Sequence, residues 1–145
     1  MSLQPYLFFD GLLEEALDFY KRAVGAEVQM LMRIKDAPEP PQPGTSPAAA
    51  GDKILHAAFK VGDALILASD GECKGKPDFR GFSLALSFPD GASVEKAFSA
   101  LASGGRVSMP LAKTFFSDSF GMLVDRFGLH WMLMLSPAQP PSDRR

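Results

Sequence analysis

Cysteine, histidine and tryptophan are nearly absent from this chain of 145 residues, which has one cysteine, two histidines and one tryptophan. The single cysteine, Cys73, cannot form a disulfide within the chain, and the sequence offers no pattern typical of a zinc cluster. These absences fit a reducing compartment. We therefore expect a protein of the cytoplasm without disulfide bonds.

An excess of charge of one sign is also missing, since 15 basic and 17 acidic residues are interspersed and give a net charge of −2. Without a basic stripe, a phosphate backbone has no complementary surface. The first residues, "MSLQPYLFFDG", have neither a charged region nor a long apolar run, and no segment approaches the roughly 18 apolar residues of a membrane helix. We expect no nucleic-acid partner and no membrane partner.

Apolar residues at helical spacing predict one helix in each half of the chain. In the first half the apolar stripe runs from Leu13 to Val24, with acidic residues in the first turn, basic residues in the last turn, and Gly25 as a stop. In the second half Asp90 is a suitable cap for a helix that a Gly-Gly pair ends. Both helices follow a short apolar segment.

Apolar runs bounded by turn residues predict eight strands, four in each half. They comprise residues 3–9, 27–35, 53–61 and 64–70 in the first half, and 81–88, 106–114, 119–125 and 129–135 in the second. The order strand, helix, three strands therefore occurs twice along the chain.

Four residues of the first half recur in the second half at one constant offset of 79: Phe19, Ala23, Gly25 and Val28 match Phe98, Ala102, Gly104 and Val107. A fixed offset across helix, stop and next strand indicates a duplicated βαβββ unit. A four-stranded sheet with one covering helix has a second, bare face, which a second unit can cover. We predict an α+β fold in which two βαβββ modules form a curved, eight-stranded cleft.

The two modules are expected to share one structural domain. We place the first module at residues 1–70, a connection at 71–80, the second module at 81–136, and a disordered tail at 137–145. Residues 36–52 contain five prolines, which allow neither a helix nor a strand ladder. We interpret residues 36–52 as a mobile flap of the first module.

Several sequence blocks resemble one known superfamily: "QPYLFFDG", "EEALDFY", "ILHAAF", "ASD", "FG" at Phe120 and Gly121, and "DRFG" before Trp131. They are similar to the PhnB-like or 3-demethylubiquinone 3-methyltransferase-like subgroup of the vicinal-oxygen-chelate superfamily, which includes glyoxalase I and bleomycin-resistance proteins. The resemblance runs from Gln4 to Leu135 and implies the glyoxalase fold. One departure is visible, because the subgroup often has a tryptophan where this chain has two phenylalanines before "FG".

In the metal-using members of that superfamily, four His or Glu ligands on the first, fourth, fifth and eighth strands hold a divalent ion. Here the first and fifth predicted strands have no His, Asp or Glu, and the usual glutamate of the last strand falls at Met132. Only Asp70, at the end of the fourth strand, could contribute. A thioether and apolar groups do not hold a hard cation, so we expect no metal and no other cofactor.

The methyltransferase name of the subgroup implies a site for S-adenosylmethionine. Such a site needs a glycine-rich turn from a strand into a helix within a parallel sheet. The chain has no such turn, because the pair Gly104 and Gly105 ends a helix. We do not expect this activity.

Two residues are the candidate catalytic groups. We prefer His56 as a general acid or base because it lies in the "ILHA" block of the subgroup, and Asp70 as a carboxylate that faces the ligand. The candidate substrate-binding residues are His130, Met109, Phe116, Phe120 and Met132. The alternatives are histidines bonded to backbone in the core, an aspartate that caps the turn at Gly71, and apolar residues that only fill the core.

These observations favour a metal-free protein that binds a small aromatic or amphipathic molecule in the cleft between the modules. One alternative is a lyase-type or isomerase-type enzyme, either with an unorthodox metal site through Asp70 and a histidine or with a metal-independent activity of His56. Another is a pure interaction module, whose cleft would be fully packed.

We also predict a homodimer, because apolar strand faces outnumber the two helices that could cover them. Light scattering should therefore give twice the chain mass of 15.6 kDa. A monomer at every concentration tested would contradict this prediction.

Overall fold

The computed structural model describes residues 1–38 and 51–137. Residues 39–50 of the predicted flap and residues 138–145 of the predicted tail lie outside the described residues. The chain divides into two units, Met1–Asp78 and Phe79–Arg145. No helix in the described ranges is long and apolar enough to cross a membrane.

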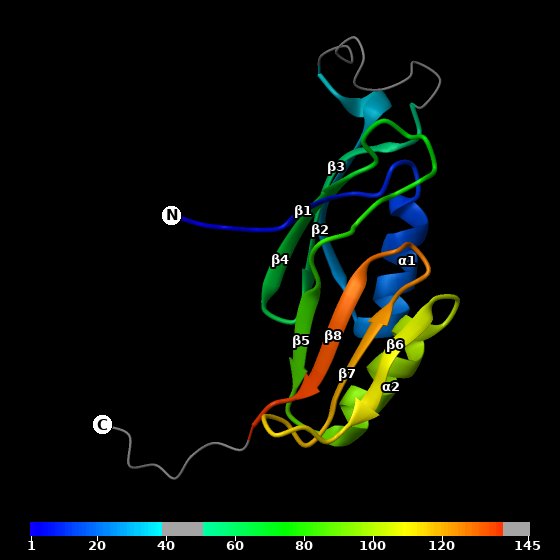
Figure 1. The fold of residues 1–145 in the computed structure, drawn as a ribbon. Helices are drawn as coiled ribbons and strands as arrows, with labels where there is room; N and C mark the ends of the chain where they lie inside the picture. Colours follow the sequence, from blue (N-terminus) through cyan, green and yellow to red (C-terminus); the bar gives the residue numbers. More distant parts are fainter. Residues whose placement is uncertain (39–50, 138–145) are drawn as a thin grey trace. The chain divides into compact units, whose positions relative to one another are not determined.

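The first unit has one helix and one four-stranded sheet (Figure 1). Its elements are β1 (Tyr6–Phe8), α1 (Leu13–Val24), β2 (Glu27–Arg33), the 3₁₀ turn η1 (Ile34–Asp36), β3 (Ile54–Val61) and β4 (Ala64–Ser69). The strand order is β1-β4-β3-β2, with β1 parallel to β4 and the other pairs antiparallel.

The second unit repeats this arrangement. Its elements are β5 (Leu84–Phe88), α2 (Gly91–Ala102), β6 (Arg106–Ala112), β7 (Phe120–Val124) and β8 (His130–Leu135). The order β5-β8-β7-β6 again has one parallel pair, β5 with β8, at one side of an otherwise antiparallel sheet. The α+β prediction of two βαβββ units is confirmed.

The predicted offset between the halves is seen in the strands that follow the helices. β2 begins at Glu27 and β6 at Arg106, and the two strands end at Arg33 and Ala112, so both ends differ by 79 positions. The first strand is shorter than predicted: β1 has three residues instead of the seven of segment 3–9. It pairs only with β4, the Pro5 carbonyl oxygen just before it accepts a hydrogen bond from Leu67 N at 3.0 Å, and Leu3 is exposed.

Helix α1 lies on one face of the first sheet because its apolar stripe meets the strand residues that point the same way. The Tyr20 ring stacks on Phe59 of β3, with centroids 6.2 Å apart, and both residues are buried. The helix ends at Gly25, whose φ of 68° is the left-handed conformation that glycine adopts without strain. Helix α2 instead begins with a side-chain cap, because Asp90 Oδ1 accepts a hydrogen bond from Ser93 N at 2.8 Å.

The last strand, β8, divides its side chains between two environments. Trp131 is 2% exposed, and its Nε1 donates a hydrogen bond to Asp125 Oδ2 at 2.9 Å. His130 and Met132, one position to either side, are only half-buried on the opposite face. The strand therefore fills a core with one face and leaves the other face partly open.

Gly105 allows the turn after α2 to approach the end of β7 closely. A Cβ at this position would overlap the Val124 carbonyl oxygen and the Asp125 backbone, whereas a Cβ at Gly91 would meet no atom within 4 Å. We predict that Gly105→Ala lowers the free energy of unfolding by about 2 kcal/mol or more, as measured by urea denaturation. The matched variant Gly91→Ala should change it by less than about 1 kcal/mol, and equal effects of the two would contradict the close-approach argument.

Candidate functional site

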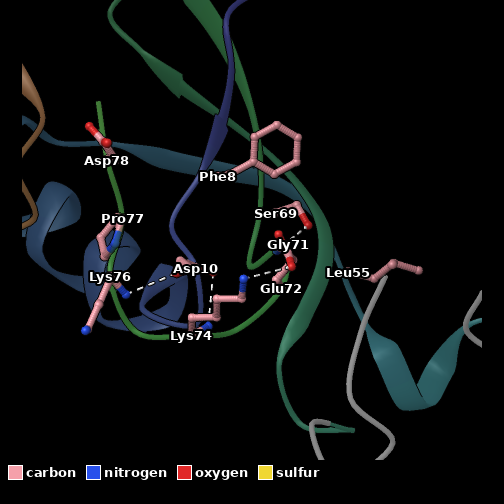
Figure 2. A pocket seen from close by; sticks show the side chains of 10 residues that line it. All are labelled: Phe8, Asp10, Leu55, Ser69, Gly71, Glu72, Lys74, Lys76, Pro77 and Asp78. Carbon is pink, nitrogen blue, oxygen red and sulfur yellow. Dashed lines mark hydrogen bonds and ion pairs between the residues drawn. The ribbon is translucent and has the colours of Figure 1, made fainter. Parts of the chain in front are cut away.

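A hollow of about 640 Å³ lies in the first unit, at the point where β1 and β4 end (Figure 2). The residues that line it are Phe8, Asp10, Leu55, Ser69, Gly71, Glu72, Lys74, Lys76, Pro77 and Asp78. Three regions contribute: the end of β1 with the turn after it, the start of β3, and the segment from β4 into the connection. The hollow thus combines an apolar wall with a charged loop.

Phe8 and Leu55 form the apolar part of the hollow. The Phe8 side chain is 56% exposed and Leu55 is 37% exposed, although both belong to strands. The Phe8 ring lies against Gly71, where an added Cβ would be 3.3 Å from Phe8 Cδ1. Gly71 has a φ of 59° and donates its N–H to Ser69 Oγ at 3.0 Å. A glycine is therefore needed here for both the turn and the seat of the aromatic ring.

Asp10 fixes the charged loop to the turn that follows β1. Its two carboxylate oxygens accept hydrogen bonds from the backbone N–H groups of Lys74, at 3.0 Å, and Lys76, at 3.1 Å. Its carbonyl oxygen accepts a third from Gly75 N. Both side-chain oxygens of Asp10 thus have backbone donors, and the loop that carries the two lysines has a defined backbone.

The two lysine side chains of this loop differ in their partners. Lys74 Nζ lies 3.2 Å from Glu72 Oε1, and both side chains of this ion pair are more than half exposed. Lys76 makes no ion pair with any residue in the described ranges. In Figure 2 the Lys74 side chain turns toward Glu72, whereas Lys76 points outward from the loop.

Asp70 is positioned by the same segment but is sealed inside the unit, with 1% of its surface exposed. Its Oδ1 accepts hydrogen bonds from the N–H groups of Gly11, at 3.1 Å, and Leu13, at 2.8 Å, and its Oδ2 accepts one from Ile54 N at 2.7 Å. The side chain caps the start of α1 and the start of β3, rather than the turn at Gly71 as the sequence suggested. This geometry offers no open carboxylate to a ligand, and Asp70 does not line the hollow.

His56 lies on β3, half-buried, on the sheet face opposite α1. Its Nδ1 is 2.9 Å from the Tyr6 hydroxyl oxygen, and the two rings are 5.6 Å apart. Burial raises the pKa of the Tyr6 phenol, so its hydroxyl keeps its proton at neutral pH. When that hydroxyl donates, Nδ1 accepts and the ring proton is on Nε2. His56 is outside the lining of the hollow, and its role in catalysis stays a prediction.

The five predicted substrate-binding residues all belong to the second unit. Strand register places four of them on the sheet face opposite α2: His130, Met132, Met109 and Phe120. Phe116 comes from the loop before β7, and its ring packs edge-on against Phe120 with centroids 5.0 Å apart. The structure therefore groups these five residues around one sheet face, and their contact with a ligand stays a prediction.

The described residues contain no group of three or more His, Cys, Asp or Glu side chains that could hold a metal ion. Asp70, the one carboxylate predicted for a metal, has both oxygens bonded to backbone N–H groups. The residues present therefore do not fit the metal of the superfamily. Cys73 lies beside the hollow, and its burial, above all, raises the pKa of its thiol. A protonated thiol is a poor nucleophile.

None of the residues that line the hollow is among the predicted site residues. Phe8 lies in the predicted strand 3–9, Asp10 lies between that strand and the first predicted helix, and residues 71–80 were predicted only to be a connection. A signal was present, because two lysines two positions apart flank a glycine in the segment "CKGKP". Nothing in the sequence indicates that Asp10 binds their backbone from more than sixty positions away.

Comparisons with known proteins place this geometry in a family. The model of the family described as 3-demethylubiquinone-9 3-methyltransferase matches residues 1–134. Protein YjdN of Escherichia coli (strain K12) is 30% identical in sequence, and the match covers 97% of this chain and 99% of the YjdN chain. Protein PA1353 from Pseudomonas aeruginosa has a solved structure with a TM-score of 0.79 and 39% identity, covering 93% of this chain and 98% of that one.

Two further solved structures share the fold. The PhnB protein from Bacillus cereus has a TM-score of 0.75 and 25% identity, covering 94% of this chain and all of that one. The fosfomycin resistance protein FosX from Listeria monocytogenes has a TM-score of 0.61 at 11% identity, covering 94% of this chain and 93% of that one. The FosX likeness shows the fold alone.

The bonds of Asp70 lead to a stability prediction. In Asp70→Asn one oxygen becomes an NH₂ group, which cannot accept from a backbone N–H and leaves a buried donor unpaired. We expect a loss of about 3 kcal/mol in the free energy of unfolding, measured by denaturant titration. Asp18→Asn, which alters an exposed side chain of α1, should cost less than about 0.5 kcal/mol. An Asp70→Asn variant as stable as the parent would show that the three hydrogen bonds contribute little.

Proposed function

This chain belongs to the family described as 3-demethylubiquinone-9 3-methyltransferase, a PhnB-like branch of the vicinal-oxygen-chelate superfamily, and we propose that it binds a small amphipathic molecule in the hollow of the first unit. The aromatic or aliphatic part of the ligand lies against Phe8 and Leu55. Its polar part meets Ser69 and the charged loop.

The observation that carries this proposal is the exposed aromatic ring inside a hollow of small-molecule size. Pockets for small molecules have volumes of roughly 300 to 1,000 Å³ and combine an apolar wall with a few placed polar groups, and this hollow has about 640 Å³. When a ligand covers a ring that is 56% exposed, apolar surface is removed from contact with water, which favours binding. Because the Phe8 ring already packs on Gly71 and Asp10 already holds the loop backbone, these groups need little further ordering when a ligand binds.

Binding is favoured over methyl transfer by the turns that lead into the two helices. Residues 9–12 before α1 and 89–90 before α2 contain one glycine between them. A nucleotide-type cradle for S-adenosylmethionine needs a glycine-rich turn between a strand and a helix of a parallel sheet. Each sheet here has only one parallel pair.

A second candidate is acid–base catalysis by the pair Tyr6 and His56. The Tyr6 hydroxyl oxygen and His56 Nδ1 are 2.9 Å apart, a distance across which a proton can be transferred, and Tyr6 is exposed while His56 is half-buried. Under this alternative, Tyr6→Phe would reduce turnover of a substrate while its binding stays unchanged. The proposed binding function does not depend on this pair, because neither residue lines the hollow.

The binding proposal can be tested with 3-phenylpropan-1-ol, a neutral amphipathic probe, by NMR titration of the ¹⁵N-labelled protein. The amide signals of Ser69, Gly71 and Gly75 should shift together. We expect Phe8→Ala to weaken binding about fivefold or more, because an aromatic contact is lost.

The matched control is Phe115→Ala, since Phe115 is 99% exposed and belongs to the second unit. This variant should bind the probe as the parent does. Unmoved amide signals around the hollow, or parent-like binding by Phe8→Ala, would contradict the proposed function.

A further inference from the structure

We propose that the ligand of this hollow is an anion, and that Lys74 exchanges its ion pair with Glu72 for the acidic group of the ligand. This inference rests on the proposed function and adds the charge class of the ligand. It also gives Glu72 a role as an internal competitor for the same ammonium group.

The charged side chains that line the hollow differ in whether they already have partners. Of the three carboxylates, Asp10 has both oxygens bonded to backbone N–H groups, Glu72 is paired with Lys74, and Asp78 has a partner of its own. Of the two ammonium groups, only Lys74 is paired. A ligand that enters therefore meets a cation, Lys76, that lacks an ion-pair partner in the described part of the chain, and carboxylates that already have backbone donors, an ion pair or another contact. This balance favours an acidic ligand over a basic one.

The ion pair between Lys74 and Glu72 can be replaced by an ion pair between Lys74 and the ligand at little cost. Its two side chains are 67% and 61% exposed, and a solvent-exposed ion pair at 3.2 Å contributes little to stability because water and salt screen it. The Lys74 backbone is fixed by Asp10 whatever its side chain does. The ammonium group can therefore change partners without disturbing the loop.

The position of the pair suits a ligand that also covers Phe8. Figure 2 draws the Lys74–Glu72 contact beside Gly71, and Gly71 is the residue on which the Phe8 ring rests. Phe8, Glu72 and Lys74 all line the same hollow. One small molecule with a ring and an acidic group a few bonds away can contact the aromatic surface and the ammonium group together.

The charge preference is tested by comparing 3-phenylpropionate with 3-phenylpropan-1-ol in the same NMR titration at low ionic strength. The two probes share the ring and chain and differ in the acidic group. We expect the carboxylate to bind about three- to tenfold more tightly, since it gains a charge-assisted contact. Added sodium chloride should remove most of this preference and leave alcohol binding unchanged.

Three variants test which residues cause the preference for the carboxylate over the alcohol. Lys74→Gln should abolish most of it, Lys76→Gln should reduce it, and Glu72→Gln should raise carboxylate affinity about threefold because the competing carboxylate is gone. In each variant the affinity for the carboxylate is divided by the affinity for the alcohol, so that a general change of the hollow cancels. The matched controls are Lys96→Gln and Glu95→Gln on α2, which belong to the other unit and should change nothing.

The outcomes separate this inference from the function on which it rests. Equal affinity for the two probes, or weaker carboxylate binding by Glu72→Gln, overturns the anion proposal and leaves the hollow a binding site. Amide signals at the hollow that respond to neither probe overturn both. An anion preference that survives in Lys74→Gln and Lys76→Gln also overturns the assignment to this loop.

Discussion

The buried carboxylate of Asp70 is the interaction on which the first unit depends. Helix α1 has no side-chain cap of its own, because Leu12 stands at its N-cap position. Asp70 supplies the missing acceptor for Gly11 and Leu13 from the end of β4, and its second oxygen holds Ile54 at the start of β3. One side chain thereby joins three segments that are far apart in sequence, and a negative charge lies at the positive end of the helix.

The hollow is a consequence of this arrangement. With Asp70 turned inward, the chain leaves β4 at Gly71 in a left-handed conformation, and the next residues return toward the turn after β1. Asp10 completes the return by binding the backbone of Lys74 and Lys76. Asp70 joins the segments of the unit from inside, and Asp10 fixes the loop that presents charge at the surface. The space between the loop and Phe8 is the proposed binding site.

Much of the fold could be predicted because its signals are local. The apolar stripe of α1, its stop at Gly25 and the cap at Asp90 each depend on residues within a few positions, and all are present in the structure. The repeat offset of 79 is also visible without any contact information, and β2 and β6 obey it at both ends. Local patterns of this kind determine which elements form and in what order.

The candidate site could be predicted only in part because it depends on long-range hydrogen bonds. The sequence identified Asp70 as a notable carboxylate but not the three N–H groups that surround it, two of which come from more than fifty positions away. The exposed ring of Phe8 has the same cause. Alternation along β1 places Phe8 opposite to Leu7, but only the path of the segment after β4 shows what lies beside the ring.

The parallel pairing in each unit has a consequence for biosynthesis. Because β1 pairs with β4 and β5 with β8, the first strand of each unit finds its neighbour only when the last strand has left the ribosome. Until then β1 exposes apolar side chains and unpaired backbone groups, which a nascent chain presents to chaperones or to other chains. Asp70 emerges directly after β4, so the residue that joins the segments of the first unit is translated at the moment when all of its partners are available.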